Sequence, residues 1–161
     1  SNSESIVHQE SYRLKLPASP HIAARSEGLT IQSDQLVAAW HSLPRNNEYI
    51  IIEGAGGLLV PLSDHYFMAD LIRDLGARVI IVSRNYLGSI NHSLLTARTL
   101  ESMGADVVGW VFNDQYLQYE EEIVAWSGFP SIGSIPQVQN PGKNFVQEQA
   151  RQILSKLNGL L

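Results

Sequence analysis

An acidic residue followed by small residues forms the most informative cluster in the sequence. Glu53 precedes Gly54, Ala55, Gly56 and Gly57. A carboxylate in this position can bind Mg²⁺, directly or through water, beside the phosphates of a substrate. The small residues let the backbone approach a ligand closely and expose N–H groups to anions. The cluster predicts a metal and phosphate site, and the alternative is a glycine-rich turn with a capping glutamate.

A second cluster comprises Leu87, Gly88, Ser89 and Asn91, where a predicted helix begins. Helix N-termini favour anions because their first N–H groups lack partners within the helix and the helix dipole is positive there. The cluster therefore predicts a site for a carboxylate. The alternative is simple N-capping of the helix by Ser89.

A third cluster, Asn113 and Asp114, follows a predicted strand. The Asn113 side chain carries both an amide donor and a carbonyl acceptor, so it can read the edge of adenine as a charged residue could not. Asp114 can order the turn. The alternative is an ordinary Asn-Asp turn after a strand.

The elements that must position these clusters can be predicted from the spacing of apolar residues. Helical spacing predicts helices over residues 36–43, 67–75, 90–103, 116–126 and 146–157. Short apolar runs predict strands over residues 49–53, 78–82 and 106–113, with a weaker one over 131–135. We expect an irregular entry segment over residues 1–30 and a single α/β domain with a mostly parallel sheet over residues 31–161. Ligands gather at the carboxyl ends of strands in such folds, so the three clusters should lie along one rim.

Composition limits the classes of partner. The net charge of −5 gives no electrostatic reason to expect nucleic acid as a partner. No apolar run reaches the roughly 20 residues that span a bilayer, so we expect no membrane partner. The absence of cysteine is compatible with a cytoplasmic location.

The order of the motifs along the chain is more specific than any one of them. In chain order they are Ser19-Pro20-His21, Glu53-Gly54-Ala55-Gly56-Gly57, Pro61-Leu62-Ser63-Asp64, Leu87-Gly88-Ser89-Ile90-Asn91-His92, Gly109-Trp110-Val111 with Asn113-Asp114, and Gly133-Ser134-Ile135-Pro136. With this set the chain resembles dethiobiotin synthetase, an enzyme family of the P-loop superfamily, from about Tyr12 to its end. The resemblance implies a three-layer P-loop NTPase-like fold.

The resemblance also implies a reaction and its site. ATP, CO₂ and 7,8-diaminononanoate would give dethiobiotin, ADP and phosphate, with Mg²⁺ as cofactor and a homodimer as the assembly. Glu53 matches the Mg²⁺ ligand, and the residues matched to ATP are Glu53, Gly54, Ala55, Gly56, Asn113, Asp114, Pro136, Gln137 and Val138. The residues matched to the diamino acid are Gly57, Leu87, Gly88, Ser89 and Asn91.

Two positions depart from the family pattern. Gln137 stands where the family often has an aromatic residue, so packing against the base can differ. Gly142 stands where an acidic residue able to contact the ribose is expected.

The sequence contains no G-x-x-x-x-G-K-[ST] motif, the loop whose amides hold phosphates and whose lysine reaches the β and γ groups. In the resembling family this loop and an active-site lysine precede the matched region. We therefore expect a C-terminal portion of such an enzyme, with no catalytic residue of its own. We expect it to bind ATP poorly and to show no detectable turnover alone, because the groups that neutralise charge act together.

Two further interpretations stay open at the level of sequence. The chain could be a nucleotide-sensing or scaffold domain of the P-loop type, which would bind adenine nucleotides without responding to the diamino acid. It could also be an inert folding fragment with an apolar sheet edge that pairs with absent strands, which would aggregate or dimerise through that edge.

Overall fold

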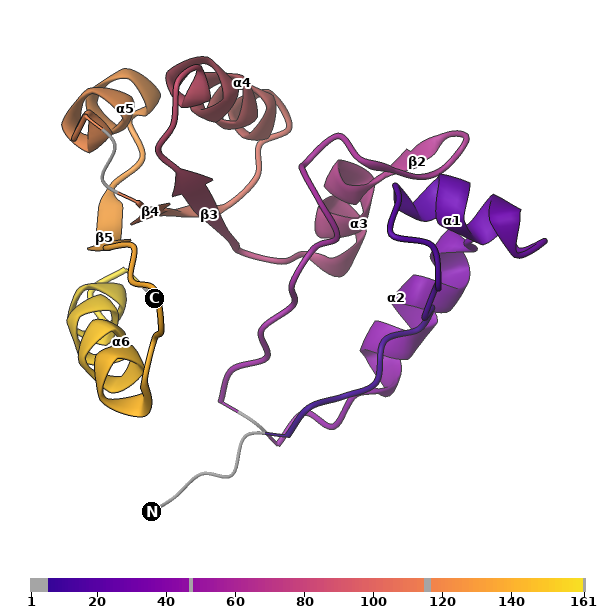
Figure 1. Cartoon of the computed structure of the whole chain (residues 1–161). Coiled ribbons are helices and arrows are strands. Elements are labelled where there is room, and N and C mark those ends of the chain that lie inside the picture. The colour runs from indigo at the N-terminus through magenta and orange to yellow at the C-terminus, as the bar shows by residue number, and fades with distance from the viewer. Residues whose placement is uncertain (1–5, 47, 115–116, 161) are drawn as a thin grey trace. The chain divides into compact units, whose positions relative to one another are not determined.

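The computed structural model describes residues 6–46, 48–114 and 117–160 (Figure 1). The chain forms two compact units, Ser1–Gly76 and Ala77–Leu161. The first unit holds the glycine-rich cluster around Glu53, and the second holds the clusters around Gly88 and Asn113. The boundary predicted between an entry segment and a single domain stays a prediction.

Helices and a short hairpin make up the first unit. Its elements are α1 (Pro20–Ser26), α2 (Ser33–Ser42), β1 (Pro61–Ser63), β2 (Tyr66–Phe67) and α3 (Met68–Leu75). β1 and β2 pair in the antiparallel direction. α2 and α3 confirm two predicted helices. The hairpin was not predicted, because two strands this short leave no periodic pattern.

The core of the first unit draws on all of these elements. Its buried members are Ala24, Ile31 and Leu62, and the partly buried side chains packed against them are Tyr12, Leu14, Leu36, Tyr66, Met68 and Leu71. The prediction of an irregular segment over residues 1–30 is therefore wrong in part, because α1 is helical and buries Ala24. Pro20 at the start of α1 is the signal that was overlooked, since the first helical N–H needs no partner.

The strand predicted over residues 49–53 is not formed, and that prediction is wrong. These residues form no regular secondary structure, and the side chain of Ile51 is 92% exposed. A strand exists only when its N–H and C=O groups pair with a neighbouring strand. The apolar run gives strand propensity, but within the described residues no second strand pairs with it.

A parallel sheet forms the centre of the second unit. Its strands are β3 (Val79–Arg84), β4 (Val107–Asn113) and β5 (Ser131–Ile135), in the order β3-β4-β5. Both pairings are parallel. All of these strands were predicted, and the α/β fold class is confirmed.

A register shift in β4 depends on a glycine. The register between β3 and β4 shifts at the start of the pairing, beside Gly109. Gly109 has φ of 149°, and a Cβ there would collide with the carbonyl oxygen of Pro130. That carbonyl accepts the Trp110 N–H at 2.8 Å. Because of the shift, Val108 and Val111 pack in the same core cluster although they are three positions apart.

Helices cover both faces of this sheet (Figure 1). α4 (Ser89–Ser102) and α5 (Glu120–Ser127) lie on one face, and α6 (Lys143–Leu157) lies on the other. α6 packs against Val108 and Ile132. The second unit therefore has the three layers expected of the family.

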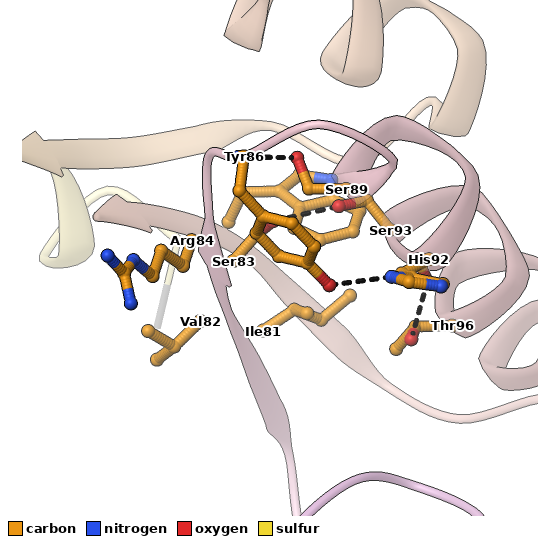
Figure 2. Close-up of a pocket in the computed structure, with 10 residues that line it drawn as sticks. Ile81, Val82, Ser83, Arg84, Tyr86, Ser89, His92, Ser93 and Thr96 are labelled. Carbon is orange, nitrogen blue, oxygen red and sulfur yellow. Dashed lines mark hydrogen bonds between the residues drawn. The ribbon is translucent and has the colours of Figure 1, made fainter. Parts of the chain in front are cut away.

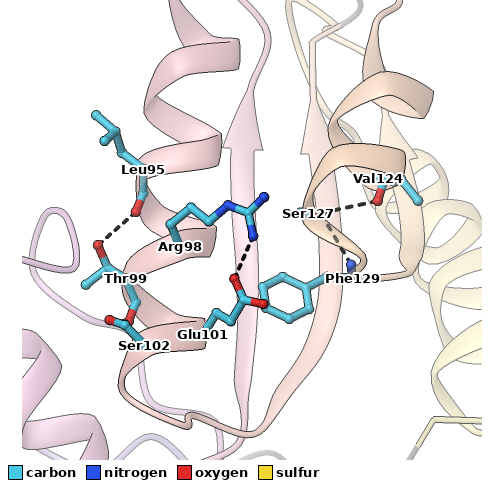
Figure 3. Close-up of polar contacts among 8 residues, drawn as sticks. All are labelled: Leu95, Arg98, Thr99, Glu101, Ser102, Val124, Ser127 and Phe129. Atoms are coloured by element: carbon cyan, nitrogen blue, oxygen red, sulfur yellow. Dashed lines mark hydrogen bonds and ion pairs between the residues drawn. The ribbon is translucent and has the colours of Figure 1, made fainter.

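The α5 helix starts later than predicted. The predicted range began at residue 116, which lies outside the described residues. Leu117 and Gln118 have φ of 55° and 50°, a left-handed conformation that a right-handed helix cannot contain. At its other end, the Ser127 hydroxyl donates to the Val124 carbonyl at 3.4 Å and accepts the Phe129 N–H at 3.3 Å (Figure 3).

Within the described part of the chain, none of the helices combines the length and apolar character needed to cross a bilayer.

Candidate functional site

The glycine-rich cluster of the first unit is an exposed loop. Glu53, Ala55 and Gly57 are all exposed. Gly56 has φ of 81°, and a Cβ there would lie 2.9 Å from Cγ2 of Val60. A side chain at this position is therefore disfavoured both by backbone conformation and by contact. The loop therefore exposes the carboxylate of Glu53 next to small residues whose backbone a ligand can approach closely.

Backbone hydrogen bonds join the end of this loop to the start of α3. The Val60 N–H donates to the Gly57 carbonyl at 3.0 Å, and the Met68 N–H donates to the Val60 carbonyl at 3.0 Å. The Ala69 N–H donates to the Leu58 carbonyl at 2.9 Å. The segment after Gly57 is thus anchored to α3, whereas Glu53 ends the apolar run of residues 49–53, which pairs with no described strand.

Two of the predicted clusters meet at one edge of the second unit. Arg84, Asn113 and Ile135 are register partners at the carboxyl ends of β3, β4 and β5. The residues that follow these ends are 87–91, 114 and 136–138, so the structure brings the Gly88 and Asn113 clusters together with the loop after β5. Glu53–Gly57 lie in the first unit, and their place on the same rim stays a prediction.

The Asn113-Asp114 turn is held from both neighbouring strands. The Asn85 N–H donates to the Asn113 carbonyl at 3.0 Å, and the Asp114 N–H donates to the Ile135 carbonyl at 3.1 Å. Asp114 has φ of 71° and its carboxylate lies 3.5 Å from Nε of Arg84. The Asn113 side chain is exposed at this edge.

A carboxylate that the sequence analysis did not single out joins these strand ends. Oε1 of Glu120, in the first turn of α5, accepts a hydrogen bond from Nδ2 of Asn85 and one from the Ser134 hydroxyl, each at 3.1 Å. Asn85 is 1% exposed, so its amide depends on this acceptor. Asn85 and Ser134 lie at the ends of predicted strands, and that position was the available signal.

The hydroxyl of Ser89 is used inside the protein. It accepts a hydrogen bond from the Tyr86 N–H at 3.2 Å and is also hydrogen-bonded to the Tyr119 hydroxyl. The Tyr119 hydroxyl in turn donates to the Tyr86 carbonyl at 2.8 Å. Since Tyr119 donates to that carbonyl, the Ser89 hydroxyl is the donor in their shared bond. Ser89 is 1% exposed. Its side chain therefore shapes the loop before α4, and Gly88 enters that helix with φ of 98°.

A small cavity lies on the α4 side of β3. It has a volume of about 150 Å³, and Ile81, Ser83, Tyr86 and His92 are among its lining residues (Figure 2). The Tyr86 hydroxyl and Nδ1 of His92 are 2.6 Å apart at its rim. Ser83 and Ser93 are hydrogen-bonded to each other at 2.8 Å. Its polar groups are thus largely paired with one another.

The residues present fit a magnesium site that is completed by a substrate. Among the described residues, no group of three or more His, Asp or Glu side chains could hold an ion by itself. Mg²⁺ in nucleotide sites is commonly held by one or two carboxylates together with phosphate oxygens and water. The exposed carboxylate of Glu53, beside small residues, is a donor of this kind.

Comparison with known proteins gives consistent matches. The family model described as AAA domain matches residues 1–143. The ATP-dependent dethiobiotin synthetase of Cytophaga hutchinsonii is 49% identical over 120 residues, which are 74% of this chain and 56% of that protein.

Two further relatives carry the same name. The protein of Aromatoleum aromaticum is 40% identical over 79% of this chain and 59% of its own length. That of Christiangramia forsetii is 36% identical over 98% of this chain and 73% of its own length. The chain thus spans less than two thirds of the length of the first two relatives.

Proposed function

The chain belongs to the dethiobiotin synthetase family, and we propose that it contributes the base-binding edge and the metal-binding carboxylate to ATP-dependent formation of dethiobiotin. The reaction joins CO₂ to 7,8-diaminononanoate and closes a ureido ring at the expense of ATP. The observation that carries the proposal is the edge of the second unit, where the ends of β3, β4 and β5 gather the matched loops.

The adenine of ATP is assigned to this edge. Asn113 offers a donor and an acceptor side by side, which is the pattern that pairs with N6 and N7 of adenine. The backbone bonds on both sides of the turn support this role because they fix where the side chain starts. The loop of Pro136, Gln137 and Val138 would flank the base, with Gln137 packing where the family often has an aromatic ring.

The carboxylate of the diamino acid is assigned to the start of α4. The Ser89 hydroxyl is hydrogen-bonded within the loop, and the Ser89 N–H donates to the Tyr86 carbonyl at 2.9 Å. Because both groups are bonded within the protein, Ser89 would shape this site rather than contact the ligand. The next N–H groups in the first helical turn and the exposed side chain of Asn91 are then the donors for the carboxylate. Leu87, Gly88 and Gly57 would complete the contacts.

Glu53 would hold Mg²⁺ beside the nucleotide phosphates, with Gly54, Ala55 and Gly56 along them. A Mg²⁺ ion held there would supply neutralisation of charge on the phosphoryl group that is transferred. The protein's own part in this loop is positioning: the glycines would keep backbone N–H groups close to the anion.

The assembly is proposed as a homodimer in the cytoplasm, with residues 87–91 reaching the diamino acid of the second subunit. We also propose that the 161 residues alone form no detectable dethiobiotin. Mass spectrometry with ¹³C-bicarbonate as the source of CO₂ tests the second statement, and labelled dethiobiotin from the chain alone would overturn it.

A chimaera tests the proposed function itself. The residues of the Christiangramia forsetii relative that precede its match to this chain are fused to the N-terminus of this chain. We expect labelled dethiobiotin from ATP and the diamino acid. The Glu53→Gln variant should lose about 100-fold in rate, because one charge-neutralising group is removed. Glu48→Gln, an exposed carboxylate in the same segment, is the matched control. A folded chimaera without product, or an unaffected Glu53→Gln variant, would contradict the assignment.

A further inference from the structure

The carboxylate of Glu120 connects the two outer strands of the parallel sheet. Its Oε1 accepts a hydrogen bond from Nδ2 of Asn85, the residue that follows β3, and another from the hydroxyl of Ser134 in β5, each at 3.1 Å. The strand order is β3-β4-β5, so the end of β4 lies between these two partners. One oxygen at the start of α5 therefore bridges the strands on either side of β4.

The turn at Asn113 is bonded to the same two strand ends. The Asn85 N–H donates to the Asn113 carbonyl at 3.0 Å, and the next N–H of the turn donates to the Ile135 carbonyl at 3.1 Å. Ile135 directly follows Ser134 and leads into the loop after β5. Each arm of the Glu120 bridge thus ends at, or one residue from, a bond that holds the proposed base-binding turn.

The amide of Asn85 depends on Glu120 for its orientation. The side chain is 1% exposed, and its Oδ1 has no hydrogen-bond partner among the described residues. The bond from Nδ2 to the carboxylate is therefore what fixes the direction of the amide. Without that carboxylate both ends of a buried amide would lack partners, and such a loss costs enough free energy to favour a local rearrangement. The rearrangement would start at the residue whose N–H holds the Asn113 carbonyl.

We propose that Glu120 is a positioning residue for the nucleotide base, which sets the separation between the Asn113 turn and the loop of residues 136–138 by holding Asn85 and Ser134. The inference rests on the proposed nucleotide function. Glu120 acts through the two strand ends and does not contact the base. A binding site needs its side chains held within about 0.5 Å of the productive geometry, so a shift of either strand end weakens binding.

A small set of variants separates this role from a contribution to stability alone. Glu120→Ala removes the acceptor of both bonds. Glu120→Gln keeps a carbonyl oxygen on a side chain of the same length, and that oxygen can accept both bonds without the charge. Ser134→Ala removes one arm of the bridge at an exposed position of β5, where loss of the fold is not expected. Glu121→Ala is the matched control, because Glu121 is exposed in the same helical turn.

The experiment measures the dissociation constant of adenosine for the whole chain by equilibrium dialysis. Adenosine probes the base site without phosphates. The folded fraction of each variant is measured in the same buffer by circular dichroism, because partial unfolding alone raises the apparent dissociation constant by the inverse of that fraction. A purely structural role of Glu120 would produce that increase and no more. A positioning role raises the dissociation constant of the folded protein as well.

After this correction, the dissociation constant should rise about five- to tenfold in Glu120→Ala and about two- to threefold in Ser134→Ala. Glu120→Gln should stay within about twofold of the parent chain, and Glu121→Ala should match it. An unchanged constant in Glu120→Ala, or an equal loss in Glu120→Gln, overturns the inference while adenosine binding by the parent chain stands. If Glu120→Ala does not fold, an unchanged constant in Ser134→Ala overturns it instead. If the parent chain does not bind adenosine, the base site itself is wrong and the inference falls with it.

Discussion

The two units support their ligand loops in different ways. In the second unit, the turn at Asn113 ends a strand with neighbours on both sides, and hydrogen bonds from Asn85 and to Ile135 hold it. In the first unit, Glu53 ends an apolar run that pairs with no described strand and leaves Ile51 92% exposed. A loop is fixed by the pairing of the strand before it, and the composition of that strand alone does not supply the pairing.

This contrast predicts that substitutions near the sheet of the second unit cost more stability than comparable ones near the loop of the first.

Gly109→Ala should be the most destabilising. A Cβ at this position would collide with the Pro130 carbonyl, and φ of 149° is unfavourable for alanine. We expect a loss of about 3 kcal/mol in the free energy of unfolding, measured by urea denaturation. Gly142→Ala is the control, because nothing lies within 4 Å of its added Cβ. Equal stability of the two variants would remove the argument for a glycine-dependent register shift.

Glu120→Ala should come second. It removes the acceptor of the buried Asn85 amide and of the Ser134 hydroxyl. The expected loss is about 2 kcal/mol, because a buried donor is left without a partner. Glu121→Ala is matched in residue type and helical turn but is exposed. The difference between the two variants in the free energy of unfolding, measured by urea denaturation, gives the contribution of the hydrogen bonds that Glu120 accepts. A difference near zero would contradict a structural role for these bonds.

Gly56→Ala should have a smaller effect, confined to its own loop. The added Cβ would lie 2.9 Å from Val60 at φ of 81°, which costs about 1 kcal/mol if the loop can adjust. Hydrogen exchange should speed up at the Val60 amide and remain unchanged in β4. Gly57→Ala, with nothing within 4 Å, is the control. A global loss as large as that of Gly109→Ala would show that the two loops are equally fixed.

Tyr66→Phe should have the smallest effect, because it should leave the phenolate absorbance at pH 11 unchanged. Burial, the hydrogen bond to Asp74 and the nearby charges of Asp74 and Asp70 together raise the pKa of Tyr66 far above its ordinary value. The stability linked to the neutral phenol is therefore complete below pH 10.0, the ordinary value, and is lost only as the pH rises above it. At pH 11, Tyr66→Phe should leave the phenolate absorbance of the chain unchanged, because the phenol of Tyr66 is still protonated there. A loss of phenolate absorbance in this variant would contradict the raised pKa.

The sequence predicted the second unit better than the first for a physical reason. Strands β3 and β4 have strong apolar runs, and helices α4 and α6 have strong helical periodicity with clear stop signals such as Gly104, with φ of 65°. The strand predicted over residues 131–135 had a weaker pattern and is nevertheless formed as β5. The run before Glu53 has equal periodicity but depends on a partner strand, which no local pattern reveals. α5 began late because residues 117–118 adopt left-handed conformations that their side chains do not indicate.

The candidate site could also be predicted only in part: the positions at strand ends were predictable, and the contacts between distant residues were not. Asn113 and Gly88 lie at strand ends, where the rule for parallel sheets places ligands, and they share an edge as expected. The contribution of Glu120 could not be predicted, because it acts through Asn85 and Ser134, which are distant from it in sequence. Glu120 meets Asn85 only because α5 begins beside the end of β3.

The most direct test of the account is a ¹H–¹⁵N correlation titration of the chain with adenosine. If adenine binds at the proposed edge, the largest shifts occur at Asn113, Asp114, Gln137 and Val138, with little change at Thr99 or Leu154. Saturating adenosine that leaves those four amides unshifted, or shifts centred instead on the cavity beside Tyr86 and His92, would contradict it.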